Sequence, residues 1–312
     1  MYTHLNRSAY LTGVLSPPVI VNGSNLLITQ SYSVQMHQDI NMDNTYLQGG
    51  PGKAIGDFKG KNIQGDISAY LRYDEASGLE DAVIDLINAA QNYDAYVSLT
   101  TFMLPYNSGI TAETFPYVYT TNSLVFDTCV VESFTISVKS EGYVELDFKI
   151  MGQNDTDNNV PINLPNDVQE VYRRLTWYDC SFSKSDSALE NLMEFRLTIK
   201  KELYQPYFLI GSCTPDRYDR PNSTGVKSVL VEFEMVEAIT TGFDLYNYVM
   251  GGYQDSGNLA GNFGPISFNI TNILFNISVI QLSPELLVKK TSGFFRLNPL
   301  DPTVHNFLLT IA

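Results

Sequence analysis

Residues 129–152 have the sequence CVVESFTISVKSEGYVELDFKIMG, in which apolar and polar residues alternate on both sides of Gly142. Side chains of a strand point to opposite faces in turn, so a period of two is typical of strands with one buried face. The alternation breaks at Gly142, and glycine suits tight turns because it adopts positive φ freely. The stretch predicts a β-hairpin, which a valine at Gly142 should disturb if the φ of that residue is positive.

The same order of alternating segments occurs twice along the chain, at an offset of about 165 residues, and such a period indicates an internal repeat. The matched segments are 28–35 with 194–200, 61–71 with 227–235, 96–103 with 266–280, and 144–150 with 307–311. We therefore predict that one β-rich unit is present in two copies.

A short motif that predicts a helix start also occurs in both copies. Residues 77–80 (SGLE) match 241–244 (TGFD), each with a hydroxyl residue three positions before a carboxylate. That spacing is typical of a capping box at a helix N-terminus. The first motif predicts an amphipathic helix over 79–90, and the second predicts a shorter helix over 245–250.

A polar, turn-rich stretch at 152–161 separates the two copies and is a candidate linker. We place the domain boundary near residue 160, which gives domains 1–160 and 161–312. The predicted fold is mainly β with minor α: two tandem β-sandwich or half-barrel domains, each with one flanking helix.

Several predicted strands, such as 268–280, contain few Lys or Pro residues. Soluble proteins usually blunt exposed sheet edges with such residues. The scarcity of Lys and Pro in these strands suggests that other chains pair with the exposed sheet edges.

The chain has 312 residues, 44% of them apolar, and a formal net charge of -15 from 34 acids and 19 Lys plus Arg. Proteins that enclose nucleic acid need clustered cations, whereas the basic pairs at 173–174, 200–201 and 289–290 are isolated. We interpret these pairs as ordinary solvated positions. No apolar run approaches the roughly 20 residues of a membrane span, so we expect no membrane insertion.

The sequence offers little for catalysis or metal binding. Cys129, Cys180 and Cys213 lack the paired spacing of a zinc site, and the three histidines lie far apart. Cys129 lies in an apolar run, so we interpret it as a small buried hydrophobe. Residues 155–159 begin like a calcium loop, but Val160 occupies the place of the turn glycine, which favours an ordinary turn. We expect no enzyme activity, no cofactor and no metal site.

The Cys-led hairpin at 129–152 resembles that of bacteriophage tail tube proteins that carry two tube domains in one chain. The strand, turn and Leu-Gly segment at 195–211 resembles the opening of that family's second domain. The resemblance covers nearly the whole chain, although Asp127 and Thr128 stand before Cys129 where the family would have a glycine.

The resemblance implies a structural virion protein, the major tail tube subunit. Six tube domains would join their strands into one continuous β-barrel ring, and stacked rings would form a conduit for DNA, which passes without specific binding. Three chains would complete a pseudo-hexameric ring, and six chains is the alternative. The implied partners are further copies and other tail proteins such as the tape measure, terminator and baseplate. The implied location is the virion tail, assembled in the host cytoplasm.

If the chain is a tube subunit, its negative net charge has a function, because three chains at -15 each carry -45 per ring. An acidic wall would repel DNA within a Debye length of about 8 Å. Glu145, Asp147 and Lys149 share one face of their predicted strand and are our candidate surface residues. That face could line the channel or face solvent.

Two other functions remain open at this point. Tandem β-sandwiches with exposed aromatic residues could form a glycan-binding, adhesin-like module. The candidate tyrosines are Tyr70, Tyr73, Tyr117, Tyr119, Tyr246 and Tyr248. An acid-rich glycosidase domain has only composition in its favour.

Overall fold

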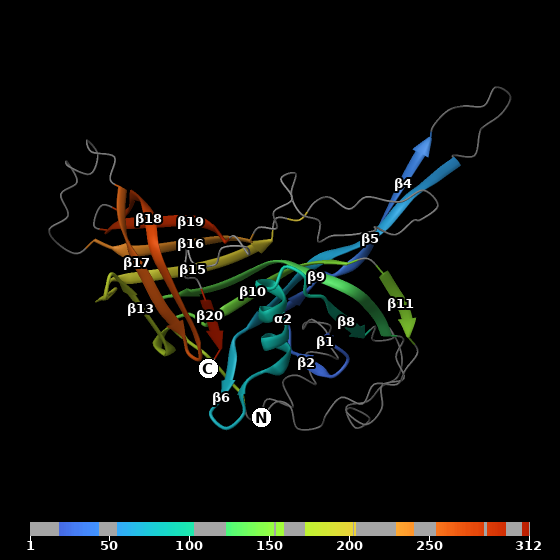
Figure 1. Cartoon of the computed structure of the whole chain (residues 1–312), viewed down its shortest axis with the longest axis horizontal. Helices are drawn as coiled ribbons and strands as arrows, with labels where there is room; N and C mark the ends of the chain where they lie inside the picture. The colour runs from blue at the N-terminus through green and yellow to red at the C-terminus, as the bar shows by residue number, and fades with distance from the viewer. Residues whose placement is uncertain are drawn as a thin grey trace.

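The computed structural model describes residues 19–43, 55–102, 123–152, 154–158, 172–201, 203, 229–239, 254–283, 286–297 and 308–311. These residues are mainly strand, which confirms the predicted mainly-β fold class (Figure 1). The described part of the chain contains one α-helix, α2 (Asp81–Gln91), and one short 3-10 helix, η1 (Trp177–Asp179).

The strands of the first half are β1 (Val19–Val21), β2 (Asn25–Leu27), β3 (Ser31–Tyr32), β4 (Gln35–Asp43), β5 (Ile55–Tyr70), β6 (Arg72–Asp74), β7 (Gly78–Leu79), β8 (Val97–Phe102), β9 (Ser123–Lys139), β10 (Glu145–Gly152) and β11 (Asn154–Asn158). Those of the second half are β12 (Arg173–Arg174), β13 (Cys180–Lys184), β14 (Ser187–Ala188), β15 (Leu192–Lys201), β16 (Val229–Ala238), β17 (Gln254–Phe263), β18 (Ile266–Ser283), β19 (Leu286–Leu297) and β20 (Leu308–Ile311).

Eight strands form a continuous antiparallel sheet through the middle of the molecule (Figure 1). Their order is β4, β5, β10, β9, β15, β16, β19 and β18. The predicted hairpin is confirmed, since β9 pairs with β10 from Val130↔Met151 to Ser137↔Glu145. The other edge of β9 pairs with β15, from Ser133↔Lys200 to Lys139↔Glu194, so the sheet crosses from the first half of the chain to the second without a break.

Strand β9 also belongs to a second layer. Its first residues pair with β8 on one side and with β11 on the other, and β8 continues to β1 and β2. The strand changes layer beside Cys129, whose fully buried thiol lies where a Cβ on Gly152 would come within 2.7 Å. The cysteine that opens the hairpin and the glycine that ends it are therefore packing partners, because only a residue without a Cβ fits there.

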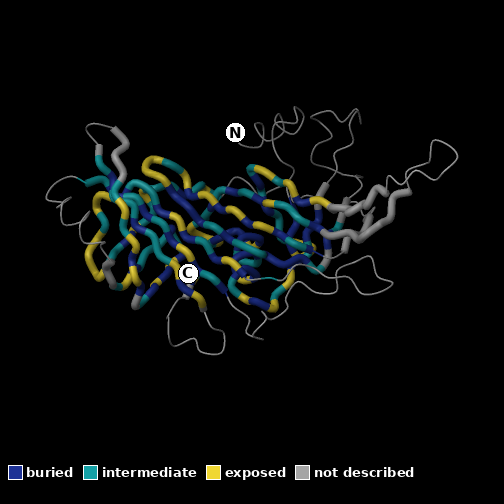
Figure 2. Tube along the Cα trace, turned by 90° about the horizontal axis from the view of Figure 1, so that it is seen from above, coloured by how far each residue is buried: buried dark blue, intermediate teal, exposed yellow. Residues whose placement is uncertain are grey.

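The core lies between the eight-stranded sheet and the elements that cover one of its faces. Helix α2 packs against β9, β15, β1 and β2. Its buried residues are Ala82, Val83, Leu86, Ile87, Ala89 and Ala90. Figure 2 shows buried segments running through the centre of the molecule, with exposed positions alternating along the strands. The amphipathic pattern of the helix and the period of two of the strands thus meet in one apolar layer.

The start of helix α2 differs from the prediction. The helix begins at Asp81, and Ser77 instead lies in the turn between β6 and β7, where its backbone N–H donates to Asp74 Oδ2 at 2.8 Å. Glu80 makes no side-chain capping bond and is only 4% exposed. The capping-box interpretation of residues 77–80 is therefore wrong. The second predicted helix, 245–250, lies outside the described residues.

Three further local predictions need correction. The φ of Gly142 is not positive; Glu141 has the left-handed conformation at φ 64°, while the N–H of Gly142 donates to the Lys139 carbonyl at 2.8 Å. The strand expected over 28–35 is not continuous: β3 contains only Ser31 and Tyr32 of it, and β4 begins at Gln35. Residues 154–158 form strand β11 instead of a turn or linker, because the edge of β9 pairs with them despite their polar sequence.

Candidate functional site

The face of the large sheet opposite the core is polar and charged. Along β10, exposed Glu145, Asp147 and Lys149 alternate with buried Leu146, Phe148 and Ile150. Helix α2 covers the apolar face of the sheet, so these three charged side chains point away from the core.

The charges of β10 are held by neighbours on the same face. Lys149 Nζ lies 2.9 Å from Glu132 Oε2, next to a bulge where Glu132 has no directly opposite residue in β10. Asp147 Oδ1 accepts a hydrogen bond from the Ser68 hydroxyl at 2.5 Å. These contacts fix the orientation of groups that sequence alone places only on a common face.

The polar face continues across the junction between β9 and β15. There the hydroxyls of Thr135 and Thr198 are 3.0 Å apart and share a hydrogen bond. Further along the sheet, Lys290 Nζ lies 2.9 Å from Glu234 Oε2. Residues opposite one another in register share a face, so both halves of the chain contribute to one surface.

This surface, which we call the charged face, carries similar numbers of acids and bases among its described residues. Its acids are Asp66, Glu132, Glu145, Asp147, Glu194, Glu232 and Glu234, and its bases are Lys139, Lys149, Arg196, Lys200, Lys290 and Arg296. Among the side chains that the structure describes on this face, seven acids stand against six bases, a formal charge of -1.

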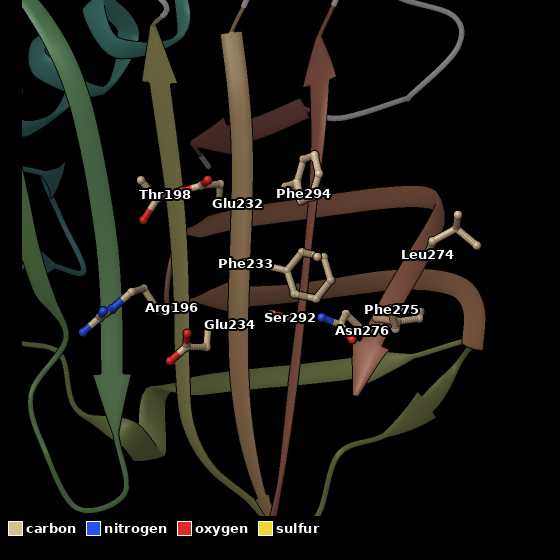
Figure 3. A pocket seen from close by; sticks show the side chains of 11 residues that line it. Arg196, Thr198, Glu232, Phe233, Glu234, Leu274, Phe275, Asn276, Ser292 and Phe294 are labelled. Atoms are coloured by element: carbon tan, nitrogen blue, oxygen red, sulfur yellow. The ribbon is translucent and has the colours of Figure 1, made fainter. Parts of the chain in front are cut away.

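The charged face is hollowed in both halves. A hollow of about 450 Å³ is lined by residues of β3, β5, β9 and β10, including Ser68 and Asp147. A larger one of about 750 Å³ lies over β15, β16, β18 and β19 (Figure 3). Two of the apolar side chains that border the larger hollow are exposed, Leu274 at 66% and Phe294 at 74%. No described residue covers this face, and its two hollows are suited to the inside of a curved wall.

The groups with perturbed pKa lie away from this surface. Burial raises the pKa of Glu80 to about 7, against the opposing effect of Arg72, whose Nη1 lies 3.7 Å from Glu80 Oε1. Burial also raises the pKa of the Cys180 thiol to about 12, with a contribution from Asp179, so this thiol stays protonated at neutral pH.

No metal centre is present among the residues that the structure describes, since no three His, Cys, Asp or Glu side chains there are grouped to hold an ion. Within the same ranges, no helix is both long and apolar enough to cross a membrane. The thiol of Cys129 is buried, as the small-hydrophobe interpretation predicts. Cys213 lies outside the described residues.

The tyrosines considered for glycan binding are not gathered on one platform. The ring of Tyr70 packs edge-on against Tyr143 at 5.2 Å, and the Arg174 guanidinium lies 4.7 Å from its centre. Tyr73 is half-buried in β6 and packs against the core. The other four tyrosines lie outside the described residues.

Two of the basic pairs behave differently from the solvated positions that we predicted. Lys201 is 1% exposed, and its Nζ donates to the carbonyl of Ala89 in helix α2 at 2.6 Å. Lys289 and Lys290 pair with Glu237 and Glu234 at 2.8 and 2.9 Å. Sequence gave no signal for the buried lysine, because nothing local shows that α2 covers the end of β15.

Comparison with known proteins identifies one family. The family of phage tail tube proteins matches residues 46–243 of this chain. No curated protein matches the chain.

Proposed function

Because this chain belongs to the phage tail tube protein family, we propose that it polymerises into stacked rings that form a hollow conduit for viral DNA. The family accounts for a structural role in the virion tail and for mainly-β folding. The strand order of the sheet supports the ring and the conduit.

The observation that carries the proposal is the order of the eight strands. The run β4, β5, β10, β9 is followed by β15, β16, β19, β18, and β9 joins β15 edge to edge. Each run is one tube domain in this proposal, with domains 1–160 and 161–312 and β11 as the last described strand of the first. A sheet built by repeating one unit edge to edge closes into a barrel when enough units are added.

The charged face lines the channel in this proposal, because the core covers the other face. Lys149 and Lys290 are each held by a carboxylate within 3 Å, and Lys139 and Arg196 both lie 3.9 Å from Glu194. Cations paired in this way are poorly available to phosphates, so DNA slides without being held. Over the described residues, paired charges thus stand where composition suggested an acidic wall.

The proposed setting follows from the family. The subunit is not an enzyme, is assembled in the host cytoplasm, and meets further copies of itself together with tape measure, terminator and baseplate proteins. Its action is geometric: it supplies a continuous wall of constant bore.

Electron microscopy of the concentrated protein tests this proposal. Three chains of eight strands give 24 strands, which at about 4.8 Å spacing and about 40° tilt close into a wall about 50 Å across. Six chains would give 48 strands and a wall about 100 Å across. We expect hollow rings or tubes of the smaller size, and monomers at every concentration would contradict the proposal.

A further inference from the structure

We propose that Asn22, in the turn between β1 and β2, is a site of spontaneous covalent modification. The side chain loses its amide as ammonia, and an aspartyl or isoaspartyl residue remains. The reaction needs only water, and it places a new negative charge where the turn contacts helix α2. This inference concerns the chemistry of one turn and does not depend on how copies of the chain assemble.

Asn22 and Gly23 form the single Asn–Gly pair of the sequence. An asparagine loses its amide when the backbone nitrogen of the next residue attacks the side-chain carbonyl carbon, and a side chain on that next residue hinders the attack. Glycine has no Cβ and the widest choice of backbone conformations, so it hinders the attack least. Among the asparagines of the chain, Asn22 therefore has the neighbour that best permits this reaction.

The turn leaves this pair open to water. Asn22, Gly23 and Ser24 are exposed, whereas Val21 before them and Leu27 after them are fully buried. A Cβ on Gly23 would have no atom within 4 Å, so the backbone has room to move. The N–H of Gly23 donates no hydrogen bond to any residue that the structure describes. The attacking nitrogen is thus exposed and is not engaged elsewhere.

The side chain of Asn22 is held by both of its polar atoms. Its Nδ2 donates to Asp85 Oδ2 in helix α2 at 2.9 Å, and its Oδ1 accepts from the backbone N–H of Ser98 at 3.2 Å. Its own backbone N–H donates to the Ser98 carbonyl at 2.9 Å. One amide group therefore ties the turn to helix α2 and to strand β8 at the same time.

The reaction balances with the chain and one water molecule. The backbone nitrogen of Gly23 gives its proton to solvent and bonds to Cγ of Asn22, while the bond from Cγ to Nδ2 breaks and the nitrogen leaves as ammonia after taking up a proton. Water then opens the resulting five-membered imide. Opening at the side-chain carbonyl gives aspartate, and opening at the backbone carbonyl gives isoaspartate, in which the main chain passes through the former side chain.

Asp85 restrains this reaction in the folded chain. Its Oδ2 accepts hydrogen bonds from both Asn22 and Asn25, each at 2.9 Å, so the amide of Asn22 must leave this contact before it can react. The attack also passes through an anionic nitrogen and an anionic oxygen, and a carboxylate close by disfavours both. Removing the charge of Asp85 should therefore speed the loss of the amide.

The product weakens the contact that the amide made. A carboxylate at position 22 cannot donate to Asp85, and the two like charges repel each other across the former hydrogen bond. Asn25 keeps its own bond to Asp85, so β2 stays attached while the turn is released. Because α2 packs against both β1 and β2, the change loosens part of the layer that covers the core (Figure 1).

Peptide mass spectrometry of the full-length protein, stored warm at pH 8, tests the inference. We expect Asn22 to lose its amide with time, while Asn25, which contacts the same carboxylate oxygen but precedes Leu26, keeps its amide. Loss at Asn22 should be about tenfold faster in urea, because the folded turn must open first. An intact Asn22 in the folded chain when the urea sample has reacted, or loss at Asn25 as fast as at Asn22, would overturn the inference.

Two variants of helix α2 test the role of Asp85. Asp85→Asn should raise the rate of amide loss at Asn22 severalfold above that of the parent. Asp81→Asn is the matched control, because it removes one acid from the first turn of the same helix, outside the contact with Asn22. Equal rates in the two variants would overturn the restraint by Asp85.

Urea unfolding tests the consequence for the fold. Asn22→Asp introduces the charge of the product without lengthening the main chain, so its urea midpoint should lie below that of the parent. The isoaspartyl form, separated from stored protein by ion exchange, should have a lower midpoint still. Midpoints equal to that of the freshly purified parent would show that the turn does not hold the layer against α2.

Discussion

Adding one methyl group at Gly152, by Gly152→Ala, should destabilise the unassembled chain by about 1–3 kcal/mol, the usual cost of overpacking a filled core. The new Cβ would lie 2.7 Å from Cys129 Sγ and 3.2 Å from Ile63 Cβ. Cys129 and Ile63 are 0% and 1% exposed, so neither can move into solvent. The strain falls where β9 passes from one layer to the other.

Removing the sulfur should relieve this strain. Cys129→Ala alone should cost about 1 kcal/mol for one lost buried atom. The double variant, Gly152→Ala with Cys129→Ala, should lose about 1–2 kcal/mol less unfolding free energy than the two single losses added together. The reason is that the alanine methyl at 152 fills the space that the sulfur leaves.

Urea unfolding followed by fluorescence measures these effects, because Trp177 is the single tryptophan of the chain and packs against Phe182. Gly152→Ala combined with Cys180→Ala serves as the matched control, in which the two effects should add. Additivity of the 129 and 152 changes within about 0.5 kcal/mol would refute the contact between them.

Three further predictions concern charge and backbone. Burial raises the pKa of Glu80 from 4.5 to about 7, so the folded state keeps this proton while the unfolded state loses it. The contribution of Glu80 to stability is therefore greatest below pH 4.5 and falls by on the order of 3 kcal/mol as pH rises to 7. Glu80→Gln should remove that fall, and urea midpoints at pH 5 and pH 8 that drop equally in both proteins would contradict this. Glu141→Gly should stabilise the hairpin by about 1 kcal/mol in thermal unfolding, because Glu141 has φ 64°, and a loss of stability would show that its side chain matters more than its backbone. Glu132→Gln with Glu234→Gln would leave Lys149 and Lys290 without their carboxylates, and tubes of this variant should retain short DNA duplexes at low salt that the parent releases. Equal retention would contradict the role of charge pairing.

The parts of the fold that sequence predicted are those with strong local periodicity. The period of two in 129–152 and the apolar stripe of 79–90 both correspond to real elements, because burial on one face imposes those periods. The capping motif failed at Glu80, since the same spacing also suits a carboxyl buried beside Arg72. Strand β11 was missed because its polar sequence pairs only under the influence of β9.

The candidate surface was only partly accessible to sequence. Alternation placed Glu145, Asp147 and Lys149 on one face, but it could not show that Glu132 neutralises Lys149 from across a bulge. The junction between β9 and β15 was also invisible, because period two predicts a strand and not its neighbour. Charge balance and edge order are properties of the assembled sheet.

Cryo-electron microscopy of the assembled tube, at a resolution that separates strands, tests the central claim most directly. The account predicts one ring of 24 inner strands from three chains, with the charged face toward the bore. A ring of six chains, or a charged face on the outer surface, would contradict it.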